Sequence, residues 1–185
     1  MAFVQVSKGR DAVAEIVGDT SHLEFERVYR ATWPDVFRYA WILTRQRQDA
    51  EDVAAEAYRR ALEAWDAGRG PGGDARPWLF VIVRRIVIDK RRRHRLVAWL
   101  PLASVQEPAD LADEESFRRS EVWLWLDQLC RTLPEQQREA LLLRFQFDLS
   151  DAAAAKILGT SAGNVRTRVS RGLATLRGRP EVMDR

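Results

Sequence analysis

The sequence predicts an all-α protein: two small helical domains joined by a flexible acidic linker, the second containing a helix-turn-helix. Nearly every periodic segment repeats its apolar residues at helical spacing, and no run alternates as a strand does. A stretch rich in Pro, Ala, Ser and acids, residues 101–116, interrupts this pattern and marks an exposed connector. After it, residues 149–171 have the pattern of two helices joined by a tight turn.

These changes in pattern divide the 185 residues into four parts. They are an N-terminal extension (1–22), a first helical domain (23–100), the linker (101–116) and a second helical domain (117–185). The sequence leaves open whether the extension is a short helix or a disordered arm. Fully extended, a linker of ~16 residues could reach roughly 55 Å.

Two helices and a loop are predicted at the start of the first domain. Residues 23–43 and 49–65 have helical periodicity, and the second run has three acids among its first four residues. Acids at that end favour a helix N-terminus because they complement the helix dipole. Residues 66–76 contain four glycines and a proline, which predicts a loop.

A basic helix is predicted from Pro77 to about Arg93. One side carries an apolar stripe facing the core: Trp78, Leu79, Ile82, Val83 and Ile86. The opposite side interleaves apolar and cationic residues: Phe80, Arg84, Ile88 and Arg91, with Val81 and Val87 at its edges. If this side faces outward, its apolar groups can contact bases while its arginines hold phosphates. Spacing alone equally allows a helix buried on both sides, with only its basic end in water.

The second domain is predicted to begin with a helix over residues 117–133, followed by one over residues 135–145 that starts after Pro134. The helix-turn-helix comes next, with its turn at Gly159-Thr160 and Ser161 capping its second helix.

The second helix of this motif has two distinct faces. Its apolar stripe consists of Val165, Val169, Leu173 and Leu176. Its other face carries Thr167, Ser170 and Arg171, flanked by Arg166 and Arg168. A helix that buries one face and presents short polar groups and arginines on the other suits a DNA major groove. DNA is therefore the leading expected partner.

Charge and composition agree with this partner. The formal net charge is only +3, but residues 84–95 hold seven Lys or Arg against one Asp. Phosphate binding depends on such local clusters, so the net charge understates affinity for nucleic acid. No apolar run approaches the roughly 20 residues that span a bilayer, and the N-terminus lacks the apolar core of a signal peptide. With a single cysteine, Cys130, expected to be a buried thiol, the predicted location is the cytoplasm.

Three segments, taken in order, resemble the extracytoplasmic-function (ECF) class of bacterial RNA polymerase sigma factors in its two-domain form. They are residues 49–65, residues 76–92, and residues 133–145 with the helix-turn-helix that follows. Together they cover roughly residues 25–177 apart from the linker. A helix-turn-helix alone would be weak evidence, since many repressors have one. Three segments in the right order at the right spacing are strong evidence for this family.

This resemblance implies an alternative sigma factor that binds core RNA polymerase and directs promoter recognition and transcription initiation. The first domain would correspond to sigma region 2 and meet the minus-ten element. The second would correspond to region 4 and meet the minus-thirty-five element. An anti-sigma factor usually holds such proteins inactive, so it is an expected partner. No catalytic residue, cofactor, metal or membrane insertion is implied, because the polymerase supplies the chemistry.

The resemblance also implies roles for individual residues. Asp52, Glu56 and Arg59 would dock on the clamp helices of the polymerase's largest catalytic subunit. The loop of residues 66–76 would cradle a base flipped from the non-template strand. DNA contacts would come from Arg84, Arg85, Ile88 and Arg91 in the first domain, and from Gly163, Arg166, Thr167, Ser170 and Arg171 in the second. Arg168 would hold phosphate or an internal carboxylate.

The sequence departs from the family pattern at three places. Ala153, Ala154 and Ala155 stand where the family usually has Glu, Ile and Ala, which removes the capping-box acid that would partner Ser150. Arg85 replaces a common Asn on the basic helix, and Asn164 replaces a usual Thr on the recognition helix.

Two other classes of protein fit less well. An enzyme would need a reactive site, but His22, His94 and Cys130 show no metal-ligand spacing and no GxxxxGK phosphate loop occurs. A DNA-binding regulator with a sensory first half would share the second domain. A receiver-type first half would need alternating strands, however, and any such half would leave the basic cluster of residues 84–95 unexplained.

Overall fold

The structure, a computed structural model, describes the backbone of residues 5–97 and 132–178, and the side chains of residues 22–93 and 132–178. Every regular element in these residues is helical, which confirms the all-α prediction. The elements are α1 (Gln5–Thr44), α2 (Arg47–Asp66), α3 (Ala75–Val97), α5 (Glu135–Leu141), η1 (Leu142–Gln146), α6 (Asp151–Leu158) and α7 (Ala162–Arg177). The predicted linker, nearly all of the predicted helix 117–133 and Cys130 lie outside the described residues.

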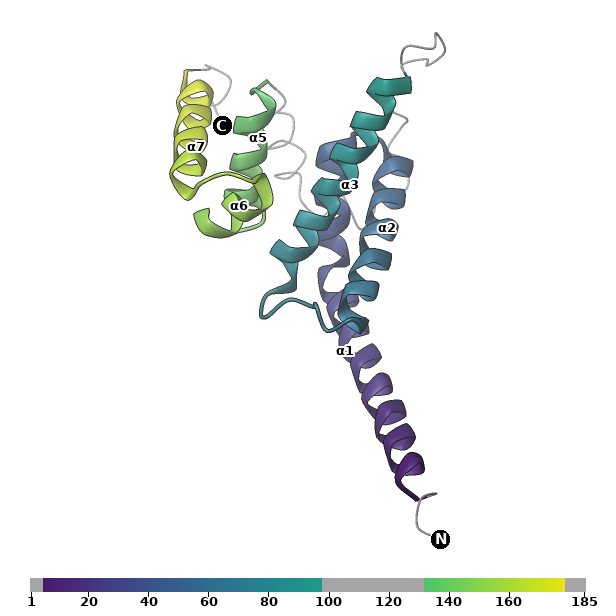
Figure 1. Ribbon diagram of the computed structural model, residues 1–185. Helices are drawn as coiled ribbons and strands as arrows, with labels where there is room; N and C mark the ends of the chain where they lie inside the picture. Colours follow the sequence, from purple (N-terminus) through teal and green to yellow (C-terminus); the bar gives the residue numbers. More distant parts are fainter. Residues whose placement is uncertain (1–4, 98–131, 179–185) are drawn as a thin grey trace.

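Helices α1, α2 and α3 form a bundle, and the N-terminal half of α1 extends beyond it (Figure 1). The predicted helix 23–43 is thus part of a 40-residue helix, and the proposed domain boundary after residue 22 falls inside it. The bundle core is formed by Val36, Tyr39 and Ile42 of α1, Val53, Ala54 and Ala57 of α2, and Leu79, Val83 and Ile86 of α3. The three residues from α3 belong to the predicted core-facing stripe.

The glycine-rich segment is a loop, as predicted, and it connects α2 to α3. Gly68 adopts a left-handed conformation with φ +68°, which glycine reaches without steric cost. Gly70 lies against the indole of Trp65, so closely that an added Cβ would meet a ring carbon at 3.1 Å. At the start of α3, Asp74 accepts a hydrogen bond from the Arg76 backbone N–H at 3.0 Å. The loop is therefore anchored at both of its ends.

The second domain departs from the predicted regular helix over residues 135–145. Helix α5 ends at Leu141 and continues as η1, a π-helical turn in which the Phe147 N–H donates to the Leu142 carbonyl at 3.2 Å. Such a turn holds one more residue than an α-helical one and shifts the side chains that follow around the axis. Leu143 and Phe147 are buried as a result, whereas Phe145 is 59% exposed.

The helix-turn-helix is confirmed as α6 and α7. Gly159 ends α6 in a left-handed conformation with φ +63°, and the Ser161 hydroxyl caps α7 by accepting from the Asn164 N–H at 3.2 Å. The Ser150 hydroxyl likewise caps α6 by accepting from the Ala153 N–H at 3.1 Å. The N-terminus of α6 is therefore capped without the acid that the family usually supplies.

Gly172 allows α7 to approach α5 closely. A Cβ at this position would lie 2.6 Å from Cδ1 and 3.3 Å from Cγ of Leu141. We expect Gly172→Val to lower the free energy of unfolding of the second domain by about 1–3 kcal/mol, because it overpacks this contact. Denaturant unfolding measures the change.

Gly163 provides a matched control on the same helix, since its added Cβ would meet nothing closer than 3.9 Å. Gly163→Val should change stability by no more than about 0.5 kcal/mol. Equal losses in the two variants would contradict the assigned helix contact.

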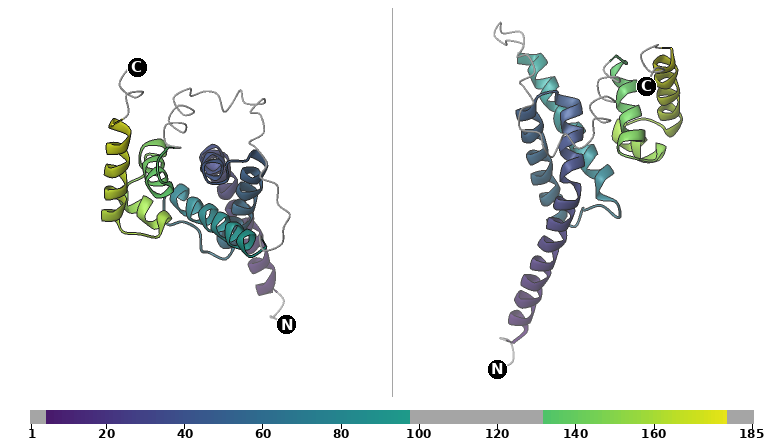
Figure 2. Two further views of the ribbon diagram at one scale, coloured as in Figure 1. Left: turned by 90° about the horizontal axis from the view of Figure 1, so that it is seen from above. Right: turned by 180° about the vertical axis from the view of Figure 1, so that it is seen from behind.

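The two domains pack against each other, with α6 beside α3 and α5 close by (Figures 1 and 2). This packing decides between the two interpretations left open for the side of α3 that carries Phe80 and Val87. Phe80 is 0% exposed and Val87 only 4%, because the second domain covers this side of α3. Of the two interpretations that spacing allowed, burial on both sides is correct for this part of the helix.

Candidate nucleic-acid and polymerase interfaces

The recognition helix α7 presents its predicted polar face to solvent. Thr167, Ser170 and Arg171 are exposed, as is Gly163 near the helix start, while Val165 is completely buried on the other side. The Thr167 hydroxyl donates to the Gly163 carbonyl at 3.1 Å, so its oxygen can still accept a hydrogen bond. This face is therefore open to solvent and carries hydrogen-bonding groups.

Arg166 is positioned by an acid at the start of α6. Its Nη1 lies 3.5 Å from Asp151 Oδ2, while Arg144 Nε lies 2.8 Å from Asp151 Oδ1. The Arg166 side chain remains 66% exposed and can reach outward. An internal carboxylate was one alternative for Arg168, but Asp151 at the start of α6 pairs with Arg144 and Arg166 instead.

The four predicted contact residues of α3 fall into two groups. Arg85 is exposed and Ile88 is 44% exposed. Arg84 and Arg91, by contrast, pair with acids of α5. Arg84 Nε donates to Glu139 Oε1 at 2.9 Å, and Arg91 Nη1 donates to Glu135 Oε1 at 2.5 Å. Arg91 also donates through Nη2 to the Leu43 carbonyl at 2.7 Å, which fixes its position against the first domain.

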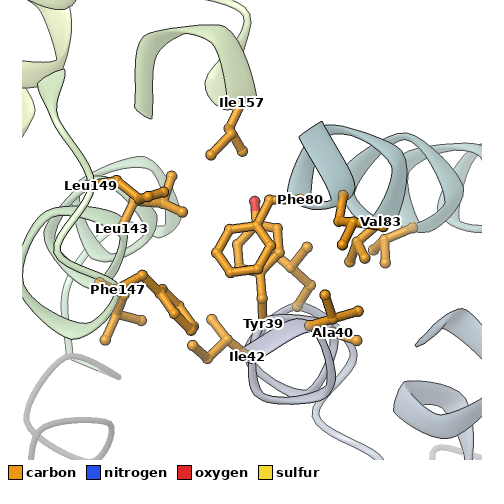
Figure 3. Close-up of a cluster of buried hydrophobic side chains, with 14 of the residues drawn as sticks. Tyr39, Ala40, Ile42, Phe80, Val83, Leu143, Phe147, Leu149 and Ile157 are labelled. Atoms are coloured by element: carbon orange, nitrogen blue, oxygen red, sulfur yellow. The ribbon is translucent and has the colours of Figure 1, made fainter. Parts of the chain in front are cut away.

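Three aromatic rings join the two domains beneath these ion pairs. Tyr39 stacks on Phe80 with ring centroids 4.6 Å apart and an interplanar angle of 20°. Phe147 of the second domain meets the edge of this pair, with its centroid 4.8 Å from that of Phe80. Figure 3 shows Ile157 of α6 directed toward the same cluster.

Glu139 links the rings to the ion pairs. Its Oε1 accepts a hydrogen bond from the Tyr39 hydroxyl at 2.7 Å, and its side chain is only 7% exposed. Burial raises the pKa of the Tyr39 phenol well above its usual value, and the negative charge of Glu139 raises it further. The phenol therefore stays protonated and remains a donor to the carboxylate.

Two of the predicted polymerase-binding residues, Glu56 and Arg59, belong to a charge network on α2. Asp52 and Arg59 are exposed and Glu56 is partly buried. Glu56 Oε2 accepts from Arg59 Nε at 2.8 Å and its Oε1 accepts from Arg60 Nε at 2.7 Å. Arg59 also pairs with Glu63. This network orders the side chains of a helix face that is open to solvent.

The two arginines should leave a measurable signature on Glu56. Hydrogen bonds from Arg59, then from Arg60, lower the pKa of Glu56 to about 2. A pKa that is lowered in the folded chain contributes stability above the ordinary value of 4.5, and this contribution is lost as the pH falls toward 2. We expect NMR titration to find the carboxylate ionised well below pH 4.5. The double variant Arg59→Gln, Arg60→Gln should return the midpoint toward 4.5; an ordinary midpoint in the wild type would contradict the network.

Comparison with known families supports two sigma domains. Residues 28–97 match the family model described as Sigma-70 region 2, and residues 123–176 match Sigma-70, region 4. Every helix of the first bundle therefore falls wholly or partly in the first match, and α5, η1, α6 and nearly all of α7 fall in the second.

Curated relatives agree with these matches. The chain is 32% identical over 147 residues to the ECF RNA polymerase sigma factor SigC of Mycobacterium tuberculosis, covering 79% of this chain and 77% of SigC. It is 30% identical over 154 residues to the ECF RNA polymerase sigma factor BldN of Streptomyces coelicolor, covering 82% of this chain. The chain spans only 58% of the length of BldN.

Solved structures show the same arrangement of helices. The sigma factor RpoE of Bartonella quintana, solved in complex with the anti-sigma factor NepR, matches with a TM-score of 0.64 and 25% identity. That match covers 88% of this chain and 99% of RpoE. CnrH, solved with the cytosolic domain of CnrY, shares the fold with a TM-score of 0.57.

On these grounds the chain belongs to the ECF class of RNA polymerase sigma factors, which direct the polymerase to promoters. Sigma factors are regulatory DNA-binding proteins and not enzymes. Among the helices of the described residues, none combines the length and the apolar character needed to cross a membrane.

Two residues of the interdomain contact were missed by the sequence reasoning. In the sequence, Tyr39 looks like an ordinary core aromatic residue. Glu139 is one of several acids on a helix, where acidic side chains usually face solvent. No local pattern distinguishes either residue, because their hydrogen bond joins positions 100 residues apart.

Proposed function

We propose that this chain is an alternative sigma factor that acts in the cytoplasm. It has no catalytic role of its own, because the polymerase supplies the chemistry. It binds core RNA polymerase through the first domain and reads promoter DNA through both domains. The domain division that we assign is residues 23–100 for region 2, 101–116 for the linker and 117–185 for region 4, after an N-terminal extension.

The observation that carries this proposal is the solvent-exposed polar and arginine face of α7 in a chain that contains both sigma regions. We assign Gly163, Arg166, Thr167, Ser170 and Arg171 to the minus-thirty-five element. An arginine fork that pairs with guanine contributes about 1–3 kcal/mol of discrimination. The N-terminus of α7 adds a favourable dipole for phosphate near Gly163.

The first domain is assigned two further tasks. Asp52, Glu56 and Arg59 are proposed to dock on the polymerase, since the charge network orders Glu56 and Arg59 on the helix that also exposes Asp52. Arg84, Arg85, Ile88 and Arg91 are proposed to meet the minus-ten element. Arg85 and Ile88 are accessible in this conformation, while Arg84 and Arg91 pair with the second domain.

An anti-sigma factor is the third proposed partner. RpoE of Bartonella quintana, which this chain resembles over nearly its whole length, was solved with such a protein. We propose that a comparable partner binds this chain and that its release frees the sigma factor for polymerase.

Run-off transcription tests the proposal directly. Purified core polymerase is incubated with genomic DNA fragments, with and without this chain, and the transcripts are mapped. We expect discrete new start sites that depend on the chain. Failure to associate with core polymerase, or an unchanged set of start sites, would refute the sigma-factor function.

A further inference from the structure

We propose that Asp151 is a positioning residue for promoter recognition. Its carboxylate, at the start of α6, holds Arg166 of the recognition helix α7 in the orientation in which this arginine reads the edge of a base. This inference rests on the proposed function, because it takes the minus-thirty-five element as the ligand of Arg166. Asp151 would then influence which sequence is bound without having to touch DNA itself.

The carboxylate of Asp151 is shared between two arginines. Its Oδ1 lies 2.8 Å from Arg144 Nε, and its Oδ2 lies 3.5 Å from Arg166 Nη1. The Asp151 side chain is 26% exposed, whereas that of Arg166 is 66% exposed. The aspartate is therefore the anchored member of the pair with Arg166, and the arginine is the member that extends into solvent.

Arg144 fixes the position of Asp151. Besides pairing with the carboxylate, it donates through Nη1 to the Leu149 carbonyl, and its side chain is half-buried. One guanidinium thus joins η1, the segment before α6 and the first turn of α6. Because Asp151 pairs with a side chain that is itself held in place, its second oxygen has a defined position beside α7.

Arg166 keeps most of its donors for DNA. A guanidinium has five N–H donors, and the ion pair with Asp151 involves only Nη1. At 3.5 Å this contact is longer than a strong charge-assisted hydrogen bond of about 2.7–2.9 Å, so it orients the arginine without withholding it. The pair also borders a hollow of about 330 Å³ that is lined by Ser170, another proposed contact residue.

The orientation of an arginine determines whether it reads sequence. Its planar fork discriminates between bases when it meets the edge of a guanine, whereas a contact to phosphate carries no sequence information. An unrestrained side chain must also be ordered on binding, which costs free energy. Asp151 reduces this cost, and its negative charge disfavours phosphate close to Arg166. The aspartate should therefore increase discrimination while lowering affinity for DNA of any sequence.

The test measures discrimination by the holoenzyme, formed from core polymerase and the full chain. Two fluorescent duplexes are compared, one with a promoter recovered by run-off transcription and one in which only the minus-thirty-five element is scrambled. Discrimination is the Kd for the scrambled duplex divided by the Kd for the promoter, both measured by anisotropy. The variant is Asp151→Asn, which keeps the size of the side chain and removes its charge.

Asp151→Asn should lower discrimination about fivefold, the lower end of what one bidentate arginine–guanine pair supplies. It should bind the scrambled duplex at least as tightly as the wild type, because a negative charge has been removed. A role confined to the stability of α6 would instead weaken binding to both duplexes equally, and that result would overturn the inference.

Asp148→Asn is the matched control. It removes the same charge three residues earlier, where the side chain is exposed and the backbone has a φ of +48°, a conformation that asparagine also adopts. The control should keep the discrimination of the wild type. An equal loss in the two variants would show that net charge, and not the pair with Arg166, sets discrimination.

A double-mutant cycle tests whether Asp151 acts through Arg166. Arg166→Ala alone should lower discrimination about tenfold, and adding Asp151→Asn should lower it no further. Independent roles would multiply to about fiftyfold and would contradict the inference.

A measurement on the wild type does not depend on the folding of any variant. NMR relaxation should find the Arg166 Nε–H group more ordered on the picosecond to nanosecond timescale than that of Arg85, which is exposed on α3. Equal mobility of the two side chains would overturn the inference.

The outcomes separate this inference from the proposed function. If start sites depend on the chain but Asp151→Asn discriminates as the wild type does, only the inference is overturned. If no start site depends on the chain, the proposed function is refuted, and the inference that rests on it is refuted as well.

Discussion

Replacing Phe80 with alanine is expected to lower the free energy of unfolding by about 3–5 kcal/mol. Phe80 is fully buried, stacks on Tyr39 and meets the edge of Phe147. Its removal leaves a cavity bordered by α1, α3 and the second domain, which cannot collapse without moving one domain relative to the other. We therefore expect the variant to lose both stability and the packing between the two domains.

Urea unfolding and small-angle scattering of the full chain measure these two effects. Ile88→Ala is the control, since Ile88 lies on the same helix two turns further on but is 44% exposed. It should cost no more than about 1 kcal/mol and leave the radius unchanged. Similar losses for Phe80 and Ile88, or an unchanged radius after Phe80→Ala, would show that the second domain does not cover this face.

Replacing Arg171 with alanine is expected to weaken binding to the upstream promoter element by about 1–3 kcal/mol, without altering binding to core polymerase. Arg171 is exposed on α7, on the face opposite the buried Val165. The loss should be largest on the preferred promoter sequence, because a base contact contributes discrimination while a phosphate contact contributes affinity for every sequence.

The measurement uses promoter fragments recovered by run-off transcription, together with scrambled fragments of the same length. Arg30→Ala is a charge-matched control, since Arg30 is exposed on α1 and pairs with Glu26. It should lower affinity for both fragments equally or not at all. An Arg171 variant with unchanged promoter preference would refute our assignment of the recognition face.

The sequence was sufficient to predict what local chemistry determines. Gly159 and Ser161 mark the turn of the helix-turn-helix because each has a local function. Gly159 ends α6 in a left-handed conformation, and Ser161 caps the N-terminus of α7. Helix α2 begins and ends within two residues of its predicted limits, because acids stand at the start of its periodic run and a glycine-rich segment follows it. The polar face of α7 is exposed as periodicity predicted, and the roles of its residues stay predictions.

What could not be predicted depends on contacts between distant residues. A helical wheel gives the faces of α3, but it does not show that a second domain covers the face containing Phe80 and Arg84. Residue spacing likewise gives no sign of the π-helical turn at η1, since a one-residue change in backbone hydrogen bonding leaves composition and periodicity almost unaltered. The sequence therefore indicated which side chains could bind DNA but not which are accessible in the free chain.

Because of the turn at η1, the packing of the two domains depends on the number of residues in this segment as well as on their types. Within this wide turn Phe145 is exposed to water, and Phe147, which follows the turn directly, is buried. Removing one residue here would turn the following ones by roughly 100° about the helix axis. Phe147 would still be present, but its ring would no longer contact Tyr39 and Phe80. This short stretch should thus tolerate exchanges of similar side chains while rejecting any insertion or deletion.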